Sequence, residues 1–395
     1  MKNIFRISMV MPVALLLAGC SSDEVNTPQT KEGSYDVQLT VTSGGTRAVT
    51  SLTGSAAENA FNEKRLFFGT YAEDGSLKHS LYEAGKCNPD EALNVRYYLP
   101  TWGPTVAAKL PRSEYEGTDF YIGAFSIPEK MTFSSLTLRG LTNNDTNTLK
   151  WPGTSDKNYA WTPEADKNGT EHIPMAGVVK IETSLMGNYN NDINQISPFR
   201  LPDITFTRAM AKIVIEDVDG IIETATLKTP EKGKLIPYLP AVLDSSVAMQ
   251  PAEPAGGKGM LLNQKLTQPT ETVNDVKRYV FYSYEWSMLE YAADGTTVTG
   301  VKNATHNDRK IITLTANAAS GLKGTTRETT QVSFAPHTAG LPGGAANLRT
   351  ADGGAWQGVM RNTVYTFRVT RPSTGGVTVE VTATPWVDHR ENFEF

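Results

Sequence analysis

The chain has 395 residues and a net charge of -5, with a sequence pI of about 5.7. This charge excludes a protein that binds nucleic acid through a basic surface. The length leaves room for about two domains of ~150 residues each.

The first residues predict export. Lys2 and Arg6 precede an apolar stretch, residues 10–17, that is too short to span a membrane and reads as a bacterial secretory signal. The run Leu-Ala-Gly-Cys that follows resembles a lipoprotein signal. The resemblance implies cleavage between Gly19 and Cys20 and acylation of the Cys20 thiol, for example by palmitate. An ordinary signal peptide with a chance cysteine is the alternative.

The next residues indicate where the mature protein is displayed. The run Ser-Ser-Asp-Glu at residues 21–24 is similar to the surface-export signal of Bacteroidetes lipoproteins. We therefore expect attachment to the outer membrane, facing outward, through a polar tether over residues 21–34. If Cys20 carries the lipid, Cys87 has no partner and no intrachain disulfide forms.

A first strand follows the tether. Residues 35–42 alternate apolar and polar side chains, which is typical of a half-buried strand with Val37, Leu39 and Val41 facing inward. The strand ends in a small-residue loop, residues 43–48, which contains Arg47.

Further short apolar runs with turn signals between them favour an all-β fold of β-sandwiches over βαβ units. These runs are residues 66–71, 95–99, 120–125, 178–183, 204–215, 225–227, 279–284, 310–315, 363–369 and 377–383. Residues 140–170 read as a long surface loop and 237–270 as an irregular insertion. The Gly-, Asn- and Pro-rich stretch 186–203 predicts a domain boundary. The expected organisation is a signal peptide (1–19), a tether with the first strand (20–47), an N-terminal β-sandwich (48–195) and a C-terminal one (196–395).

The sequence offers no catalytic motif, so we expect neither an enzyme nor a bound metal or cofactor. No P-loop or Gly-x-Ser-x-Gly elbow is present. Asp217 and Asp219 are compatible with a loop cation, and turn chemistry explains them equally well. The histidines form no metal-binding pair; they are His79, His172, His306, His337 and His389.

Several motifs, in this order, resemble the fimbrillin family, the type V pilins of Bacteroidales. They are the lipoprotein leader, Arg-Ala at 47–48, Ile-Pro-Met-Ala-Gly at 173–177, Thr-Arg-Ala-Met-Ala-Lys-Ile at 207–213, Phe-Tyr-Ser-Tyr-Glu at 281–285, Met-Arg-Asn-Thr-Val-Tyr at 360–365 and Thr-Pro-Trp at 384–386. The resemblance implies two β-sandwich domains of transthyretin-like topology. It also implies a structural subunit of surface fimbriae that support adhesion and biofilm growth.

The resemblance further implies an assembly route. An arginine-specific protease would cut between Arg47 and Ala48 and remove the first strand with its lipid. The groove left behind would accept a strand from another copy or a related pilin, head to tail. The expected donor lies at the C-terminus, with alternating apolar residues Val377, Val379, Val381, Phe393 and Phe395. A stalk or tip position is favoured over an anchor.

Each step has an alternative. Arg47 can be an ordinary loop residue, the first strand can stay as a permanent edge strand, and residues 377–383 can be only the last strand of their own sandwich. A lipid-retaining anchor subunit would keep its first strand. A surface glycan-binding lipoprotein would need exposed aromatic platforms, for which Trp102, Trp151, Trp161 and Trp356 are candidates, and a monomeric adhesin that binds a host or bacterial surface ligand is a third possibility.

Overall fold

The structure is a computed structural model. It describes residues 33–43, 58, 65–99, 103–129, 132–133, 138, 148–150, 161–163, 172–186, 198–229, 232–234, 262–284, 286–287, 289–291, 298–301, 312–316, 326–329, 358–359, 361–371 and 378–385. Cys20, Arg47, Ala48, Val377, Phe393 and Phe395 lie outside these residues, and so does the predicted leader.

Nearly all regular secondary structure in the described residues is strand, which confirms the all-β class. The strands before the middle of the chain are β1 (Ser34–Ser43), β2 (Leu66–Tyr71), β3 (Leu77–Glu83), β4 (Lys86–Cys87), β5 (Arg96–Tyr98), β6 (Thr105–Pro111), β7 (Phe120–Ser126), β8 (Thr132–Phe133), β9 (Thr148–Lys150), β10 (Met175–Ile181), β11 (Phe199–Arg200) and β12 (Ile204–Arg208). The helical turns η3 (Glu91–Leu93) and α1 (Arg112–Tyr115) are short. The transthyretin-like topology stays a prediction.

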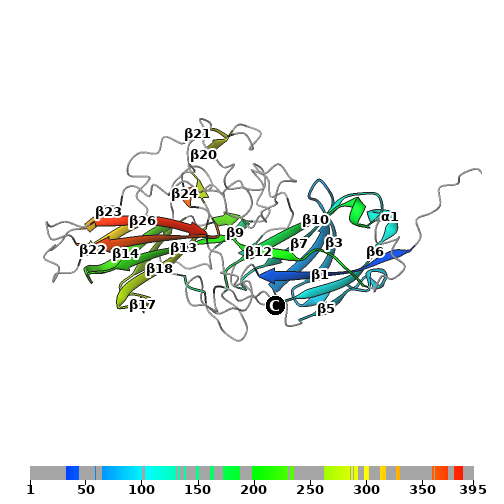
Figure 1. The fold of residues 1–395 in the computed structure, drawn as a ribbon, viewed down its shortest axis with the longest axis horizontal. Coiled ribbons are helices and arrows are strands. Elements are labelled where there is room, and N and C mark those ends of the chain that lie inside the picture. Colours follow the sequence, from blue (N-terminus) through cyan, green and yellow to red (C-terminus); the bar gives the residue numbers. More distant parts are fainter. Residues whose placement is uncertain are drawn as a thin grey trace, which may run out of the picture.

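The later strands form a second group, which lies beside the first along the long axis of the molecule (Figure 1). They are β13 (Met210–Asp217), β14 (Ile222–Thr229), β15 (Lys232–Lys234), β16 (Leu262–Leu266), β17 (Glu271–Val273), β18 (Val276–Tyr284), β19 (Trp286–Ser287), β20 (Leu289–Tyr291), β21 (Val298–Val301), β22 (Ile312–Ala316), β23 (Thr326–Thr329), β24 (Gly358–Val359), β25 (Thr363–Thr370) and β26 (Thr378–Pro385).

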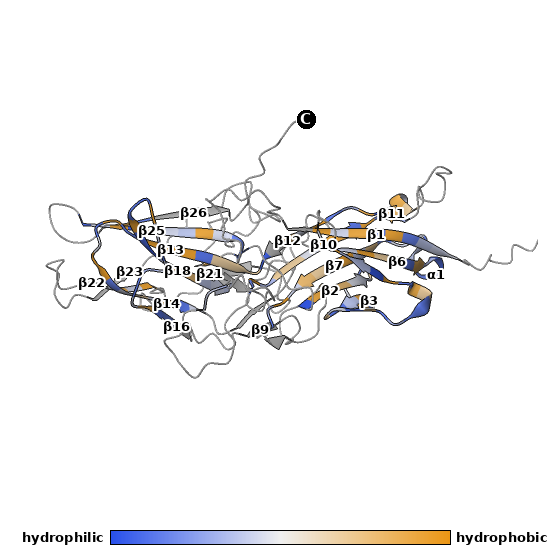
Figure 2. Cartoon of the chain, turned by 90° about the horizontal axis from the view of Figure 1, so that it is seen from below, coloured by the Kyte–Doolittle hydropathy of each residue, from blue (hydrophilic) through white to orange (hydrophobic). Residues whose placement is uncertain are grey.

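In the first group, β8 and β9 pair with β15 in a small separate sheet. The other strands form one large sheet in the order β4-β3-β2-β7-β10-β12-β1-β6-β5, with β11 also paired to β1. Buried residues of β1 and β6 share a single hydrophobic cluster with those of β2, β7 and β10. The part of the sheet that contains β2, β7 and β10 and the part that contains β1 and β6 therefore pack against one core. The pairing of β1 with β12 joins the two parts. Hydrophobic segments on β1 and β7 are visible in Figure 2.

The two larger sheets of the second group form a sandwich, and β19 pairs with β24 and β20 with β21 in two-stranded sheets. A sheet in the order β17-β18-β13-β25-β26 faces a sheet in the order β16-β14-β22-β23. Side chains from both sheets, including Ile213 and Phe367 from one and Leu227 and Leu314 from the other, form the second hydrophobic cluster.

Strands β13 and β18 contribute to both cores. In β13, Ile213 and Ile215 belong to the second cluster, whereas Val214 belongs to the first. In β18, Phe281 belongs to the second cluster and Val280 to the first. Because successive side chains of a strand point to opposite faces, this sheet lies between the two cores.

Strand positions agree with the sequence prediction where an apolar run is clear, as in β2 and β7. The predicted strand 204–215 is divided into β12, which joins the first sheet beside β1 and β10, and β13, which joins the second. Two strands occur where irregular structure was predicted, β9 within 140–170 and β16 within 237–270. Strand β6 was not predicted, because its Ala-rich sequence lacks β-branched alternation.

Among the described residues, no helix is long and apolar enough to cross a membrane. Within the same residues, no cluster of His, Cys, Asp and Glu is arranged to hold a metal ion.

Candidate functional site

Strand β1 lies inside the first sheet. It runs antiparallel to β6 from Ser34↔Pro111 to Thr40↔Thr105. On its other side it runs parallel to β11 at Val37↔Phe199 and to β12 from Val41↔Ile204. The alternative that β1 is an edge strand is therefore wrong, and both of its backbone edges are paired.

The inward face of β1 is completely enclosed. Tyr35, Val37 and Leu39 are 0% exposed and Val41 is 1% exposed. Burial of each such side chain stabilises the fold by about 1.5–3 kcal/mol. The alternation read from the sequence thus identified the core-facing side chains of this strand.

The start of β1 is held by α1. The Arg112 guanidinium lies over the Tyr35 ring at 4.8 Å from its centroid, and the Arg112 backbone N–H donates to the Gly33 carbonyl. An arginine over an aromatic face is an attractive cation–π arrangement.

The other end of β1 is covered by residues 103–105. Thr40 and Thr105 are 0% and 1% exposed, and their hydroxyl oxygens lie 3.0 Å apart. The Thr105 hydroxyl donates to the Gly103 carbonyl at 3.2 Å. Since a hydroxyl has only one proton, Thr40 is the donor to Thr105. The Val41 N–H donates to the Pro104 carbonyl at 2.9 Å.

A buried polar cluster lies where the two groups of strands meet, around Glu58. The Glu58 carboxylate, 1% exposed, accepts from Lys212 at 2.8 Å and from the Tyr282 hydroxyl at 2.5 Å. Arg208 donates to the Glu58 backbone carbonyl and to the Asn362 side chain, both at 3.3 Å. Burial, and then the Glu58 carboxylate, raise the pKa of Tyr282, which keeps its hydroxyl protonated as a donor.

The Glu58 cluster unites separate sequence motifs. Arg208 and Lys212 come from the Thr-Arg-Ala-Met-Ala-Lys-Ile motif, Tyr282 from Phe-Tyr-Ser-Tyr-Glu and Asn362 from Met-Arg-Asn-Thr-Val-Tyr. Glu58 itself was not predicted, because its surrounding sequence gives no periodic signal that marks a buried carboxylate.

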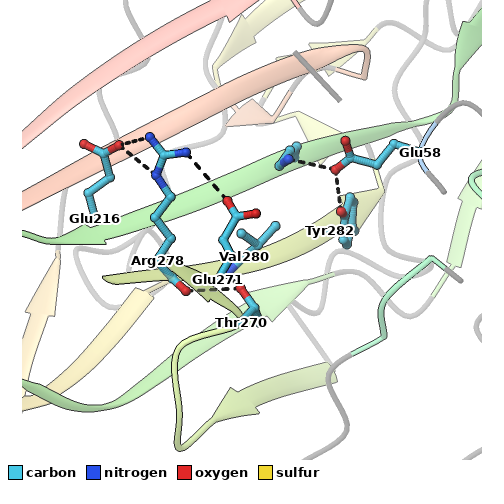
Figure 3. A network of polar contacts seen from close by, with 8 residues as sticks. Glu58, Glu216, Thr270, Glu271, Arg278, Val280 and Tyr282 are labelled. Carbon is cyan, nitrogen blue, oxygen red and sulfur yellow. Dashed lines mark hydrogen bonds and ion pairs between the residues drawn. The ribbon is translucent and has the colours of Figure 1, made fainter. Parts of the chain in front are cut away.

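Further along β18, Arg278 forms a second, more exposed polar group. It donates to Glu216 at 2.7 Å and lies 3.7 Å from Glu271 (Figure 3). Figure 3 also shows the Tyr282–Glu58 contact, which lies further along the same strand. Ion pairs of such partly exposed groups contribute little to stability.

The predicted donor region is visible only in part. Strand β26 pairs with β25 from Thr363↔Pro385 to Thr370↔Thr378 and forms the outer strand of its sheet. Val379 and Val381 lie on this strand. In the single chain, therefore, β26 belongs to its own sandwich, as one alternative predicted. One edge of β26 has no partner strand among the described residues.

Other predicted candidates have structural roles. The Asp217 carboxylate accepts from the N–H groups of Ile221 and Ile222, which is turn chemistry. Asp219 accepts from the Arg371 N–H, a long-range contact that ties its turn to the end of β25. Burial raises the pKa of Asp217, and the two N–H donors oppose that rise. Trp161 is 1% exposed and packs edge-on against Tyr282 at 5.5 Å. It is therefore no exposed platform, and Trp102, Trp151 and Trp356 lie outside the described residues.

One pair resembles catalytic chemistry. The Ser126 hydroxyl lies 2.7 Å from a ring nitrogen of His172. Both side chains are 0% exposed. Because a substrate cannot reach a fully enclosed hydroxyl, the pair is a buried structural hydrogen bond.

A scan of protein-family models finds no match for this chain, and a search of curated proteins finds no similar sequence. Among solved structures, it is similar to the tip fimbrial protein Mfa3 from Porphyromonas gingivalis with a C-terminal truncation, at 13% identity and a TM-score of 0.46 over 89% of this chain and 100% of that one. It is also similar to a candidate cell adhesion protein from Parabacteroides distasonis, at 12% identity and a TM-score of 0.40 over 90% of this chain and 98% of that one. A candidate polysaccharide-binding protein from Bacteroides thetaiotaomicron is similar at 8% identity and a TM-score of 0.39, over 91% and 99%. All three TM-scores lie below 0.5.

Proposed function

We propose that this chain is a structural subunit of a surface fimbrium, in a stalk or tip position, whose first strand is removed and replaced by a strand of another subunit. The route is lipoprotein export, cleavage between Arg47 and Ala48 and head-to-tail strand exchange. The chain carries no enzymatic activity in this role, needs no cofactor and supports adhesion and biofilm growth. Its domains are those expected from the sequence, except that β11 and β12 belong to the first sheet.

The observation that carries the proposal is the interior position of β1. Removing β1 would separate β6 from β12 by the width of one strand and leave two unpaired backbone edges facing each other. It would also uncover the apolar floor beneath Val37, Leu39 and Val41. Unpaired edges beside an apolar groove are a template for an added strand.

The Glu58 cluster supports the same proposal. Residue 58 follows Arg47 in the chain, so it stays in the protein after cleavage. Its bonds to Lys212 and Tyr282 hold the new N-terminal segment against the second group of strands. Loss of β1 therefore leaves the junction between the groups intact.

A lipid-retaining anchor subunit is the second candidate. It is favoured by the number of interactions that hold β1, from the Arg112–Tyr35 contact at one end to the Thr40–Thr105 bond at the other. A strand fixed at both ends resists removal.

The test is intact mass and N-terminal sequencing of the protein taken from the cell surface, alongside an R47K variant. We expect the native protein to begin at Ala48 and to form SDS-resistant multimers. R47K keeps the charge but removes the arginine-specific site, so it should retain β1 and stay monomeric. A native protein with acylated Cys20 and an uncut Arg47 would favour the anchor.

A further inference from the structure

We propose that the buried hydroxyl chain Thr40–Thr105–Gly103 fixes the register of any strand that fills the place of β1. The strand that fits is β26 of a second copy, with Thr382 at the level of Thr40. This inference rests on the proposed strand exchange.

Removing β1 would leave a gap between β6 and β12, and each residue of β1 marks one level along that gap. The hydroxyl chain makes the level of Thr40 different from the others. Along β1, Asp36 and Gln38 point away from the core and are partly exposed, whereas Thr40, on the same side, is 0% exposed. Because the Thr105 hydroxyl donates its one proton to the Gly103 carbonyl, its oxygen accepts a hydrogen bond from the strand paired with β6. An occupying strand without a hydroxyl at this level leaves a buried acceptor unsatisfied, which is unfavourable.

A second requirement lies one residue further. The Val41 N–H donates to the Pro104 carbonyl, so the residue at that level must have a backbone N–H. Proline has none. A third requirement is the apolar alternation of the levels occupied by Tyr35, Val37, Leu39 and Val41.

Strand β26 together with Val377, which precedes it in the sequence, meets all three requirements in one register, if the strand keeps the direction of β1 and so stays antiparallel to β6. With Thr382 at the Thr40 level, residues 377, 379 and 381, all Val, occupy the levels of Tyr35, Val37 and Leu39. Ala383 occupies the level of Val41 and supplies its N–H. Glu380 falls at the partly exposed level of Gln38.

The neighbouring registers of β26 do not meet these three requirements. A shift of two residues one way places Glu380, a carboxylate, at the enclosed Thr40 level, where charge burial is costly. A shift the other way places Pro385 at the Val41 level, without the required N–H. With Thr378 at the Thr40 level, Gly375 and Ser373 fall on two core-facing levels. Shifts by odd numbers turn the valines away from the core.

The same register explains why exchange has to follow cleavage. At three of the four core-facing levels the β26 residue is smaller than the resident one, with Val for Tyr35, Val for Leu39 and Ala for Val41. A smaller side chain fills the site less well. In the uncut chain β1 therefore outcompetes β26.

The test uses the full chain cut at Arg47, with the cut confirmed by mass. The probes are synthetic peptides of residues 376–385 and of 34–43. We expect the native 376–385 peptide to bind, the T382V peptide to bind about tenfold more weakly, and the T382S peptide to recover the affinity. The T384V peptide is the matched control, because it loses a hydroxyl two levels away, and its affinity should change less than about twofold.

A T105V protein provides the second arm. Without the Thr105 oxygen, the T382V peptide should bind at least as tightly as the native one. We expect T40V to lower the melting temperature of the uncut native chain and not to lower that of the uncut T105V chain. Equal binding of native and T382V peptides to the unaltered protein, or a loss confined to T384V, would overturn the register while leaving strand exchange standing. Failure of every peptide, including 34–43, to bind the folded cut chain would overturn the proposed function as well.

Discussion

At the scale of single residues, the most consequential side chain is Glu58. It is a buried carboxylate with Lys212 and the Tyr282 hydroxyl as partners, and it joins a segment near the start of the chain to strands β13 and β18. An isolated buried charge is strongly unfavourable, so the partners depend on one another.

We expect E58A to be severely destabilising. Removing the carboxylate leaves the Lys212 ammonium, 15% exposed, without its anion, and breaking a buried pair in this way costs about 3–5 kcal/mol of unfolding free energy. Urea denaturation measures the change. The control is D203A, which breaks the exposed Arg200–Asp203 pair and should cost at most about 1 kcal/mol. Equal effects of the two substitutions would contradict the assigned role of Glu58.

Asp119 gives a prediction in pH. Its carboxylate binds Lys180 at 2.6 Å and accepts from the N–H and hydroxyl of Thr183, and these contacts lower its pKa from 3.8 to about 2. Because the folded pKa is lower than the unfolded one, the stabilisation is present above pH ~4 and is lost as the pH falls toward ~2.

We therefore expect the melting temperature of the native protein to fall more steeply between pH 4 and pH 2 than that of D119N. Thermal denaturation at a series of pH values measures both slopes. Since Asn cannot titrate, parallel slopes for the two proteins would argue against a lowered Asp119 pKa.

At the scale of elements, β1 depends on a glycine that the sequence alone does not single out. Gly103 has φ +131°, and a methyl group added there would overlap the Val41 carbonyl oxygen. Gly220 also has positive φ, +65°, but a methyl group there meets no atom within 4 Å. The two positions share the backbone restriction and differ in the contact with β1.

G103A should loosen the end of β1, whereas G220A should show only the backbone strain of about 1 kcal/mol. Hydrogen exchange at the Val41 amide, which donates to Pro104, reports the loosening directly. We expect faster exchange in G103A and no change in G220A. Unchanged exchange in both would show that residues 103–105 do not hold the strand.

Several elements were predictable because one physical signal dominates them. The period-2 alternation of β1 identified its buried face, and the apolar run at residues 66–71 identified β2, which the structure buries along its whole length. Strand β6 carried no comparable signal, although it provides one wall of the gap. Its residues Ala107 and Ala108 are buried by their neighbours, not by their own propensity.

At the scale of the whole molecule, the two cores are coupled through β13 and β18. Ile213 packs in the second core and Val214 in the first, on opposite faces of one strand. Because β13 is paired along its length with β18, the strand cannot leave one core while staying in the other.

We expect unfolding to be cooperative across both cores. I213A and V214A each remove buried methyl groups and should lower the unfolding free energy by roughly 2 kcal/mol. Either substitution should reduce hydrogen-exchange protection in β7 of the first core and in β14 of the second. If I213A affects only β14 and V214A only β7, the two cores unfold independently.

The sequence by itself determined what depends on neighbouring residues: the all-β class, the alternation of β1 and β26, and the absence of a recognisable catalytic motif. The tertiary structure alone decided what depends on distant pairs. These are the interior place of β1 between β6 and β12, the burial of Thr40 against Thr105, and the meeting of Glu58 with Lys212 and Tyr282. The physical reason is that periodicity reports which face of a strand is apolar, whereas sheet order and buried polar contacts are set by packing between segments far apart in the chain.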